Sequence, residues 1–201
     1  MNRTRLKVAL LAPLAAISVS ACGINSIPTA EEEAKARWAD VQNQYQRRAD
    51  LIPNLVASVQ GAAAQERNVL REVTEARANA TRIQLSPEQL RDPEAMRAFS
   101  EAQGRLTSAI IPLQRLQEAY PDLKTNQNFL ALQSQLEGTE NRVTIARTDY
   151  NRAVQNYNTR IRTFPDVIGA KVFYGAEPMV PFEATTQNAE QAPKVDFGNG
   201  Q

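Results

Sequence analysis

The chain has 201 residues, of which 42% are hydrophobic and 22% charged, with 8 glycines and 11 prolines. These values fit one folded domain with a substantial core and not a globally disordered chain. Histidine is absent and cysteine occurs once, which removes most zinc, haem and iron–sulfur ligand sets and every Ser/His or Cys/His nucleophile pair. We therefore expect no metal, no cofactor and no enzymatic activity.

The charge distribution argues against a nucleic-acid partner. The formal net charge is +1, but Arg3, Arg5 and Lys7 precede Cys22 and no acid does. A chain cut before Cys22 keeps 20 of the 23 bases against 22 acids, and so lacks the basic footprint of a nucleic-acid-binding protein. No pattern indicates a small-molecule substrate either.

The first 21 residues have the composition of an export signal. Basic residues precede the apolar run 8–20, which as a helix is about 20 Å long and short of a hydrocarbon core of about 30 Å. Val19-Ser20-Ala21-Cys22 resembles the bacterial lipobox, in which cleavage before the cysteine frees it for lipid attachment. We expect 1–21 to be a signal peptide and Cys22 to be lipidated; the alternative is an uncleaved signal anchor with an incidental cysteine.

The residue after the cysteine bears on location. Gly23 stands where an Asp would retain a lipoprotein in the inner membrane, so the context resembles that of lipoproteins sorted to the outer membrane. We therefore expect a membrane-anchored envelope protein that faces the periplasm, with the outer membrane favoured. We expect residues 22–29 to consist of the lipidated cysteine and a tether, and Pro28 indicates that this tether is extended.

Apolar residues then recur at intervals of three and four from Trp38 to Ala80, which predicts one helix over 30–80. Pro53 lies inside it and leaves the carbonyl of Ala49 without its intrahelical partner. Because the apolar spacing continues in phase through Pro53, we expect a kinked continuous helix. Arg48 and Glu66 occupy positions on the apolar seam; wet helix ends explain them more simply than a buried ion pair does.

Two further helices follow, over 93–119 and 122–163. Asp92 is a helix N-cap with Pro93 in the first helical position, and Pro112 predicts a kink. In the last helix Tyr150-Asn151 and Tyr157-Asn158 repeat at seven residues, so both tyrosines face one way. Their rings are expected to pack, with the hydroxyls at the rim, and a binding groove is the alternative.

The periodic pattern ends at Pro165. Residues 166–182 carry apolar residues broken by glycine and proline, which predicts an irregular strap that folds back onto the helices. Residues 183–201 are polar and are expected to form a disordered tail. The helical bundle domain is thus expected over 30–165.

Several blocks resemble those of the LemA family: RRADLIPNLV (47–56), VTEARANA (73–80), YPDLKTNQNFLALQSQLEGTENRV (120–143), ARTDYNRAV (146–154) and Phe164-Pro165. The resemblance implies an all-α, up-and-down antiparallel bundle of long helices at the bacterial envelope. It implies no reaction, since the family has no agreed biochemical activity; some relatives are associated with building magnetosome membranes. Many members resemble single-pass membrane proteins, whereas this chain has a lipobox.

The blocks on the last helix carry a set of polar and aromatic residues that the resemblance marks as family signature and that we interpret as structural. They are Asn128, Glu140, Asn141, Arg147, Tyr150, Asn151, Tyr157 and Asn158.

The expected helix lengths leave part of the first seam uncovered, because the second helix is roughly 35 Å shorter than the first. Trp38, Val41, Tyr45 and Arg48 are then expected to be exposed and to form a partner surface. The favoured function is a lipid-anchored interaction or assembly module that pairs with a second copy or another envelope protein. The alternatives are a lipid or amphiphile carrier and, least favoured, an enzyme that uses Glu137, Glu140, Arg147, Tyr150 or Tyr157.

Overall fold

The computed structural model describes residues 25–183, so the predicted signal peptide, Cys22 and the tail beyond Glu183 lie outside the described residues. Every regular element in the described range is helical, which confirms the all-α prediction. The elements are α2 (Ser26–Gln60), α3 (Arg67–Arg82), η1 (Glu88–Arg91), α4 (Pro93–Ala119), α5 (Pro121–Thr125), α6 (Gln127–Arg160), α7 (Asp166–Gly169) and η2 (Ala170–Tyr174).

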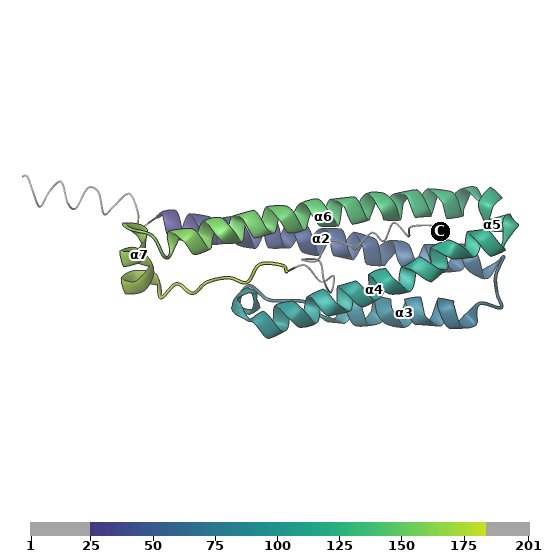
Figure 1. Ribbon diagram of the computed structural model, residues 1–201, viewed down its shortest axis with the longest axis horizontal. Helices are drawn as coiled ribbons and strands as arrows, with labels where there is room; N and C mark the ends of the chain where they lie inside the picture. The colour runs from purple at the N-terminus through teal and green to yellow at the C-terminus, as the bar shows by residue number, and fades with distance from the viewer. Residues whose placement is uncertain (1–24, 184–201) are drawn as a thin grey trace, which may run out of the picture.

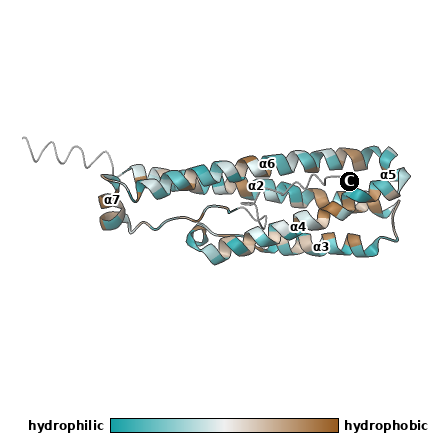
Figure 2. Ribbon diagram, viewed as in Figure 1, coloured by the Kyte–Doolittle hydropathy of each residue, from teal (hydrophilic) through white to brown (hydrophobic). Residues whose placement is uncertain are grey.

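The bundle consists of two antiparallel helix pairs (Figure 1). α2 and α6 have 35 and 34 residues, so each is about 50 Å long and they cover one another over their whole length. α3 and α4 form a shorter pair along one side of α2 (Figure 1). Hydrophobic and hydrophilic residues alternate along the ribbons of α2 and α6, as expected for helices that bury one stripe (Figure 2).

The prediction of one continuous helix over 30–80 is wrong. The helix ends at Gln60, residues 61–66 form a turn, and α3 runs back along the bundle. Gly61 follows the last helical residue, and Ala63 inserts fully buried beneath the turn. Folding back gives the second half of the seam a partner in α4, which a straight helix of about 75 Å would have lacked. The start also differs, because the helix begins at Ser26 and the tether is therefore shorter than residues 22–29.

Pro53 is accommodated inside α2, as the in-phase pattern predicted, and the carbonyl it frees has a partner from another helix. The Nε of Arg77 in α3 donates a hydrogen bond to the Ala49 carbonyl oxygen at 2.7 Å. A backbone acceptor that cannot be used within α2 thus becomes a contact that fastens α3 to it.

α4 begins as predicted, since the Asp92 carboxylate accepts from the backbone N–H of Glu94 at 2.9 Å and Pro93 is the first helical residue. Pro112 lies within the unbroken α4. The helix predicted over 122–163 is divided, because α5 ends at Thr125 and Asn126 caps α6. The Asn126 side chain accepts from the N–H groups of Asn128 and Phe129, which starts the long helix there.

The core near the start of α2 is aromatic. The ring of Trp38 lies 5.2 Å from Phe99, 5.4 Å from Tyr150 and 5.6 Å from Phe182 between centroids. These contacts join α2, α4, α6 and the segment after η2. Aromatic pairs at such distances contribute beyond their buried area, so this cluster fixes how the two helix pairs meet.

The exposure expected for the proposed partner surface is wrong. Trp38, Val41, Tyr45 and Arg48 have exposed fractions of 3%, 0%, 7% and 1%. The expectation failed because it rested on a first helix of about fifty residues. With the chain folded back after Gln60, α2 matches α6 in length and no seam is left over.

The C-terminal part of the described chain combines helical turns with an extended segment. α7 and η2 form an elbow beyond the end of α6, and residues 175–183, which we call the strap, then run back along the bundle (Figure 1). Met179 and Phe182 of the strap are buried, at 2% and 6% exposed. Ile168, Val172 and Phe173, which were also expected to fold back, remain exposed.

Candidate functional site

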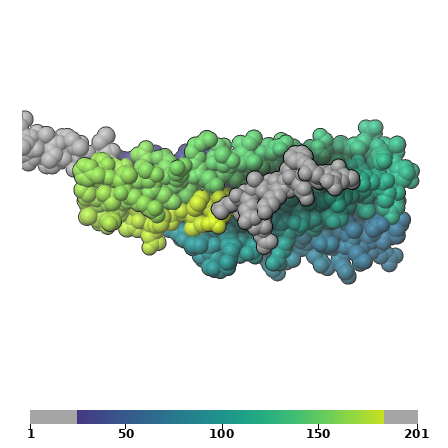
Figure 3. Space-filling view, viewed as in Figure 1, coloured from purple at the N-terminus to yellow at the C-terminus, as the bar shows by residue number. Residues whose placement is uncertain are grey.

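A groove runs between α4 and α6, with α2 as its floor, and extends to α3, which contributes Glu72, Glu75, Ala76 and Asn79 to its lining. Its volume is about 1190 Å³, and the space-filling view shows the surface hollowed between these two helices (Figure 3). Tyr45 and Arg48 of α2 form part of the floor, and Val180, Pro181 and Glu183 of the strap lie at one end. The walls carry carboxylates and guanidinium groups beside apolar side chains such as Met96 and Val143, and the groove is open to solvent.

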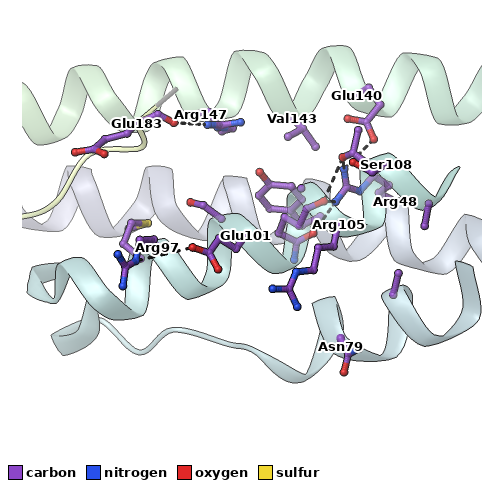
Figure 4. A pocket seen from close by; sticks show the side chains of 18 of the residues that line it. Arg48, Asn79, Arg97, Glu101, Arg105, Ser108, Glu140, Val143, Arg147 and Glu183 are labelled. Atoms are coloured by element: carbon purple, nitrogen blue, oxygen red, sulfur yellow. Dashed lines mark hydrogen bonds and ion pairs between the residues drawn. The ribbon is translucent and has the colours of Figure 1, made fainter. Parts of the chain in front are cut away.

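Arg48 is the buried charge of this groove (Figure 4). Its Nη1 donates to Thr107 Oγ1 at 2.8 Å and to Glu140 Oε1 at 2.9 Å. Its Nη2 donates to the side-chain oxygen of Gln103 at 2.6 Å and to the main-chain oxygen of Gln103 at 3.2 Å. One guanidinium therefore links α2 to both α4 and α6 through charge-assisted hydrogen bonds.

The pair between Arg48 and Glu140 is asymmetric. The Arg48 side chain is 1% exposed, whereas the Glu140 side chain is 38% exposed. Glu140 therefore keeps much of its hydration while Arg48 has lost its own, so removing Glu140 would leave the buried Arg48 without a counter-ion. Tyr45 adds a second contact, since its ring centroid lies 5.0 Å from the guanidinium carbon of Arg48. The interpretation of Arg48 as a wet helix end is wrong.

The outer part of the groove holds charges with weaker partners. Arg97 on α4 is bonded to Glu94 at 2.9 Å and lies 3.9 Å from Glu101. Arg105 also lines the groove and forms no ion pair with any other residue of the range 25–183. The Arg105 guanidinium is therefore available to a bound ligand.

Two signature asparagines hold the strap against α6. Asn158 Nδ2 donates to the Met179 carbonyl at 2.8 Å, and the Met179 N–H donates to Asn158 Oδ1 at 2.9 Å. Asn151 makes the same pair of bonds with Phe182, at 3.0 Å and 2.8 Å. Each amide thus pairs with a backbone as a neighbouring β-strand would, although no strand is present in the described range.

The spacing explains why the asparagines repeat at seven. Seven residues of α-helix rise about 10.5 Å, and the three residue-to-residue steps from Met179 to Phe182 span about 10 Å when extended. The two asparagines therefore meet the strap in register. The asparagines of the Tyr-Asn repeat therefore do bind a polypeptide segment, and that segment is the strap of the same chain.

The tyrosines of the repeat are buried, and the expectation of hydroxyls at the rim is wrong. Tyr150 and Tyr157 are both 0% exposed, and the Tyr150 hydroxyl donates to the Val180 carbonyl at 3.0 Å. Burial raises the pKa of Tyr45, Tyr150 and Tyr157, so their phenols stay neutral at ordinary pH. They are poorly suited to act as bases.

The remaining signature residues divide between the groove and the solvent. Arg147 stacks on Phe182, with its guanidinium carbon 4.7 Å from the ring centroid, and donates to the Glu183 carbonyl. Glu140 contacts Arg48, as above. Asn128 and Asn141 are exposed on α6 and lie outside both the groove and the strap contacts.

Sequence reasoning missed the partners that α4 and the strap contribute. Gln103 and Thr107 bond Arg48, and Phe182 completes the aromatic cluster. The presence of Arg48 on an apolar seam signals that buried acceptors must exist, since an unpaired buried guanidinium is costly. It does not say which helix supplies them.

Comparisons with known proteins place this architecture. The LemA family model matches residues 37–197. Magnetosome proteins MamQ 1 and MamQ 2 of Paramagnetospirillum magneticum are each 25% identical over 174 residues, covering 79% of this chain and 64% of theirs. MamQ of Magnetospirillum gryphiswaldense is 24% identical over 176 residues, covering 80% of this chain and 65% of its own.

This chain therefore spans slightly less than two thirds of the length of those relatives. Within residues 25–183, no helix is long and apolar enough to span a membrane. The matched residues include α3, α4, α6, the strap and residues 37–60 of α2, and so contain the groove and both asparagine contacts. On this match, which covers most of its length, the chain belongs to the LemA family.

Proposed function

We propose that this protein is a lipid-anchored component of the bacterial envelope that binds a segment of another protein in the groove between α4 and α6. The observation that carries the proposal is the groove itself: about 1190 Å³ of open space between helices that the buried Arg48 links through both of its Nη atoms. A pocket built on a rigid floor loses little conformational freedom when it is filled.

The lining favours a polypeptide as the ligand. Carboxylates and guanidinium groups alternate along the walls, and Arg105 has no ion-pair partner among the described residues. A peptide supplies both signs of charge together with backbone groups. The strap supports this assignment, because α6 already binds an extended backbone through Asn151 and Asn158. A partner segment would bind beside it by the same chemistry.

The anchor is inferred from sequence. Lipidation of Cys22, cleavage after residue 21 and sorting to the outer membrane form one hypothesis, which family membership and the membrane association it implies support. Metabolic labelling with a palmitate analogue tests it: the native chain should be labelled and Cys22→Ala should not. An unlabelled, uncleaved native chain refutes the lipoprotein.

The alternative, a carrier of lipid or another amphiphile, has less support. Such a carrier needs an enclosed apolar void for the acyl chain, whereas this groove is open and its walls are charged. Catalysis has less support still, because the buried tyrosines are held neutral and Glu140 is engaged by Arg48. We assign no catalytic residue.

Site-specific photo-crosslinking in the native envelope tests the proposal. A photoreactive amino acid replaces Ser108, which lines the groove on α4, in the full chain. The matched control replaces Ile145, which is 60% exposed on α6 and does not line the groove. A discrete protein adduct at position 108 and none at 145 supports the proposal; an adduct of twice the chain mass identifies a second copy as the partner.

A blocking variant separates binding in the groove from proximity to it. Gly104 lines the groove and a Cβ there would meet nothing within 4 Å, so we expect the indole of Gly104→Trp to occupy the groove and abolish the adduct, with helicity by circular dichroism as the check on folding. Gly61→Trp, in the turn after α2 and also without close neighbours, should leave it. Equal adducts at 108 and 145 refute the groove as the site, and adducts with the mass of a phospholipid favour the carrier.

A further inference from the structure

The elbow beyond α6 gathers most of the exposed large hydrophobic side chains of the described range. Phe164, Ile168, Val172, Phe173 and Tyr174 are 79%, 53%, 69%, 67% and 43% exposed. We call these five residues the apolar foot. The other exposed large hydrophobics of residues 25–183 are Ile111, Leu130 and Ile145, which lie apart on α4 and α6. An exposed apolar cluster of this kind marks a surface that contacts a membrane or another molecule in the functional protein.

The foot is held outward by an ordered backbone. Ala170 is 1% exposed and its carbonyl accepts from the N–H of Ala176 at 3.0 Å, which closes the turn at the end of η2. Gly175 allows this turn through a φ of 54°. The buried side of the elbow therefore packs on the bundle while the foot has no intramolecular surface to cover it.

The position of the foot identifies what covers it. The Ser26 hydroxyl donates to the Asp166 carboxylate at 2.6 Å, so the elbow lies against the first turn of α2. This is one end of the elongated helical bundle, which we call the rod (Figure 1). Cys22 precedes Ser26 by four residues, which span at most about 14 Å when extended. A lipid on Cys22 therefore brings this end of the bundle, and no other, to the bilayer surface.

The chemistry of the foot fits that surface. It combines two phenylalanines, a tyrosine and two aliphatic side chains, the mixture found where proteins enter the interface between headgroups and acyl chains. Arg162 and Lys171 are exposed beside it and can reach lipid phosphates, whereas Asp166 is turned toward Ser26 and Arg160.

We propose that the apolar foot inserts into the interfacial layer of the bilayer and, together with the lipid on Cys22, forms a two-point attachment that sets the rod's orientation. The proposal rests on the lipid anchor of the proposed function. A single attachment at Cys22 would let the rod lie down, whereas two points at one end hold the groove away from the membrane, where another protein can reach it.

Fluorescence quenching by brominated lipid tests the insertion. The full acylated chain is reconstituted into vesicles of phosphatidylcholine brominated high on the acyl chains, with Phe173→Trp as the reporter and Ile145→Trp as the matched exposed control. The native Trp38 is common to both and lies twelve residues beyond Ser26, about 18 Å along the helix. We expect emission from Phe173→Trp to be quenched and emission from Ile145→Trp to be unchanged.

A second change tests whether insertion causes the quenching. Adding Val172→Asp to the Phe173→Trp chain should remove the quenching, because a carboxylate in the foot opposes insertion; helicity by circular dichroism confirms that the variant is folded. Unquenched Phe173→Trp in a chain that floats with the vesicles overturns the foot and leaves the anchor, and it assigns this surface to a protein partner. A chain that carries no lipid and does not float overturns both.

Discussion

The hydrogen bond from Arg77 to Ala49 makes a prediction about why a proline inside α2 is tolerated. Pro53 has no N–H, so the Ala49 carbonyl lacks the bond it would have in a regular helix. Arg77 Nε reaches that oxygen at 2.7 Å from α3. Replacing Arg77 by Met keeps most of the aliphatic stem and removes the donor, so the variant isolates the hydrogen bond from the packing.

The expected size follows from the charge and exposure of the pair. A hydrogen bond with an ionised donor contributes about 1.5–3 kcal/mol when buried, and this one is only partly buried, so we expect Arg77→Met to cost about 1.5 kcal/mol. In a Pro53→Ala background the new N–H of residue 53 satisfies the Ala49 carbonyl. Arg77→Met should then cost about 0.5 kcal/mol or less, which leaves a coupling of about 1 kcal/mol.

Urea unfolding followed by circular dichroism at 222 nm, on the native chain, both single variants and the double variant, measures this coupling. The midpoint should shift with an unchanged slope, because the change is in stability and not in the surface exposed on unfolding. An equal cost of Arg77→Met in both backgrounds would refute the reasoning, since Arg77 would then stabilise the bundle by some means unrelated to the proline. A Pro53→Ala variant that alters the helix boundary is detected by its change in ellipticity.

Further predictions concern the strap, a glycine, the buried tyrosines and the groove floor. Asn158→Leu leaves both main-chain groups of Met179 unpaired and should cost about 2 kcal/mol in urea unfolding; Asn141→Leu, at an exposed site, is the control and should cost little. Gly104→Ala should stabilise by up to about 1 kcal/mol, because the added methyl meets nothing within 4 Å; a lower midpoint would contradict this. Burial raises the pKa of Tyr150 above its ordinary value of 10.0, so above pH 10 this tyrosine ionises in the unfolded chain before it does in the folded one. The free energy of unfolding then falls, by up to about 1.4 kcal/mol per pH unit for each buried tyrosine. Tyr150→Phe should lose stability less steeply between pH 9 and 11, and an unchanged slope would exclude a contribution from Tyr150. Arg48→Met leaves the buried Gln103 without its donor and should cost about 3 kcal/mol, whereas Glu140→Gln keeps a neutral acceptor at a half-exposed site and should cost about 1 kcal/mol; the reverse order would contradict the asymmetry of the pair.

Local signals predicted the start of α4 correctly. Asp92 and Pro93 begin α4 as expected because a cap and a proline at the first position act through atoms a few residues away. The turn at residues 61–66 was missed for an equally local reason. Apolar spacing stays in phase when a turn happens to preserve it, so the seam cannot distinguish one long helix from two that fold back. Gly61, which directly follows the last residue of α2, is the local signal in the sequence that coincides with this turn.

The site could be predicted only in part, because its contacts join residues far apart in the chain. The seam position of Arg48 indicates a buried charge that needs acceptors, but those come from Gln103 and Thr107, 55 and 59 residues away. The repeat of Asn151 and Asn158 indicates a shared face. Its ligand is a strap whose irregular sequence carries no period of its own. In both cases half of an interaction is visible in the sequence and the fold supplies the rest.

The floor of the groove carries a charge at a position where a bundle would ordinarily place a leucine. An apolar side chain at position 48 would need no acceptor from either α4 or α6. The guanidinium instead requires oxygen acceptors on both sides, Gln103 and Thr107 on α4 and Glu140 on α6, and these hold the two helices apart at the width of a hydrogen-bonded cluster. Buried charges of this kind contribute little net stability compared with a well-packed apolar core. What Arg48 adds to this bundle is a charged, hydrogen-bonded link between α2, α4 and α6 at the floor of the groove.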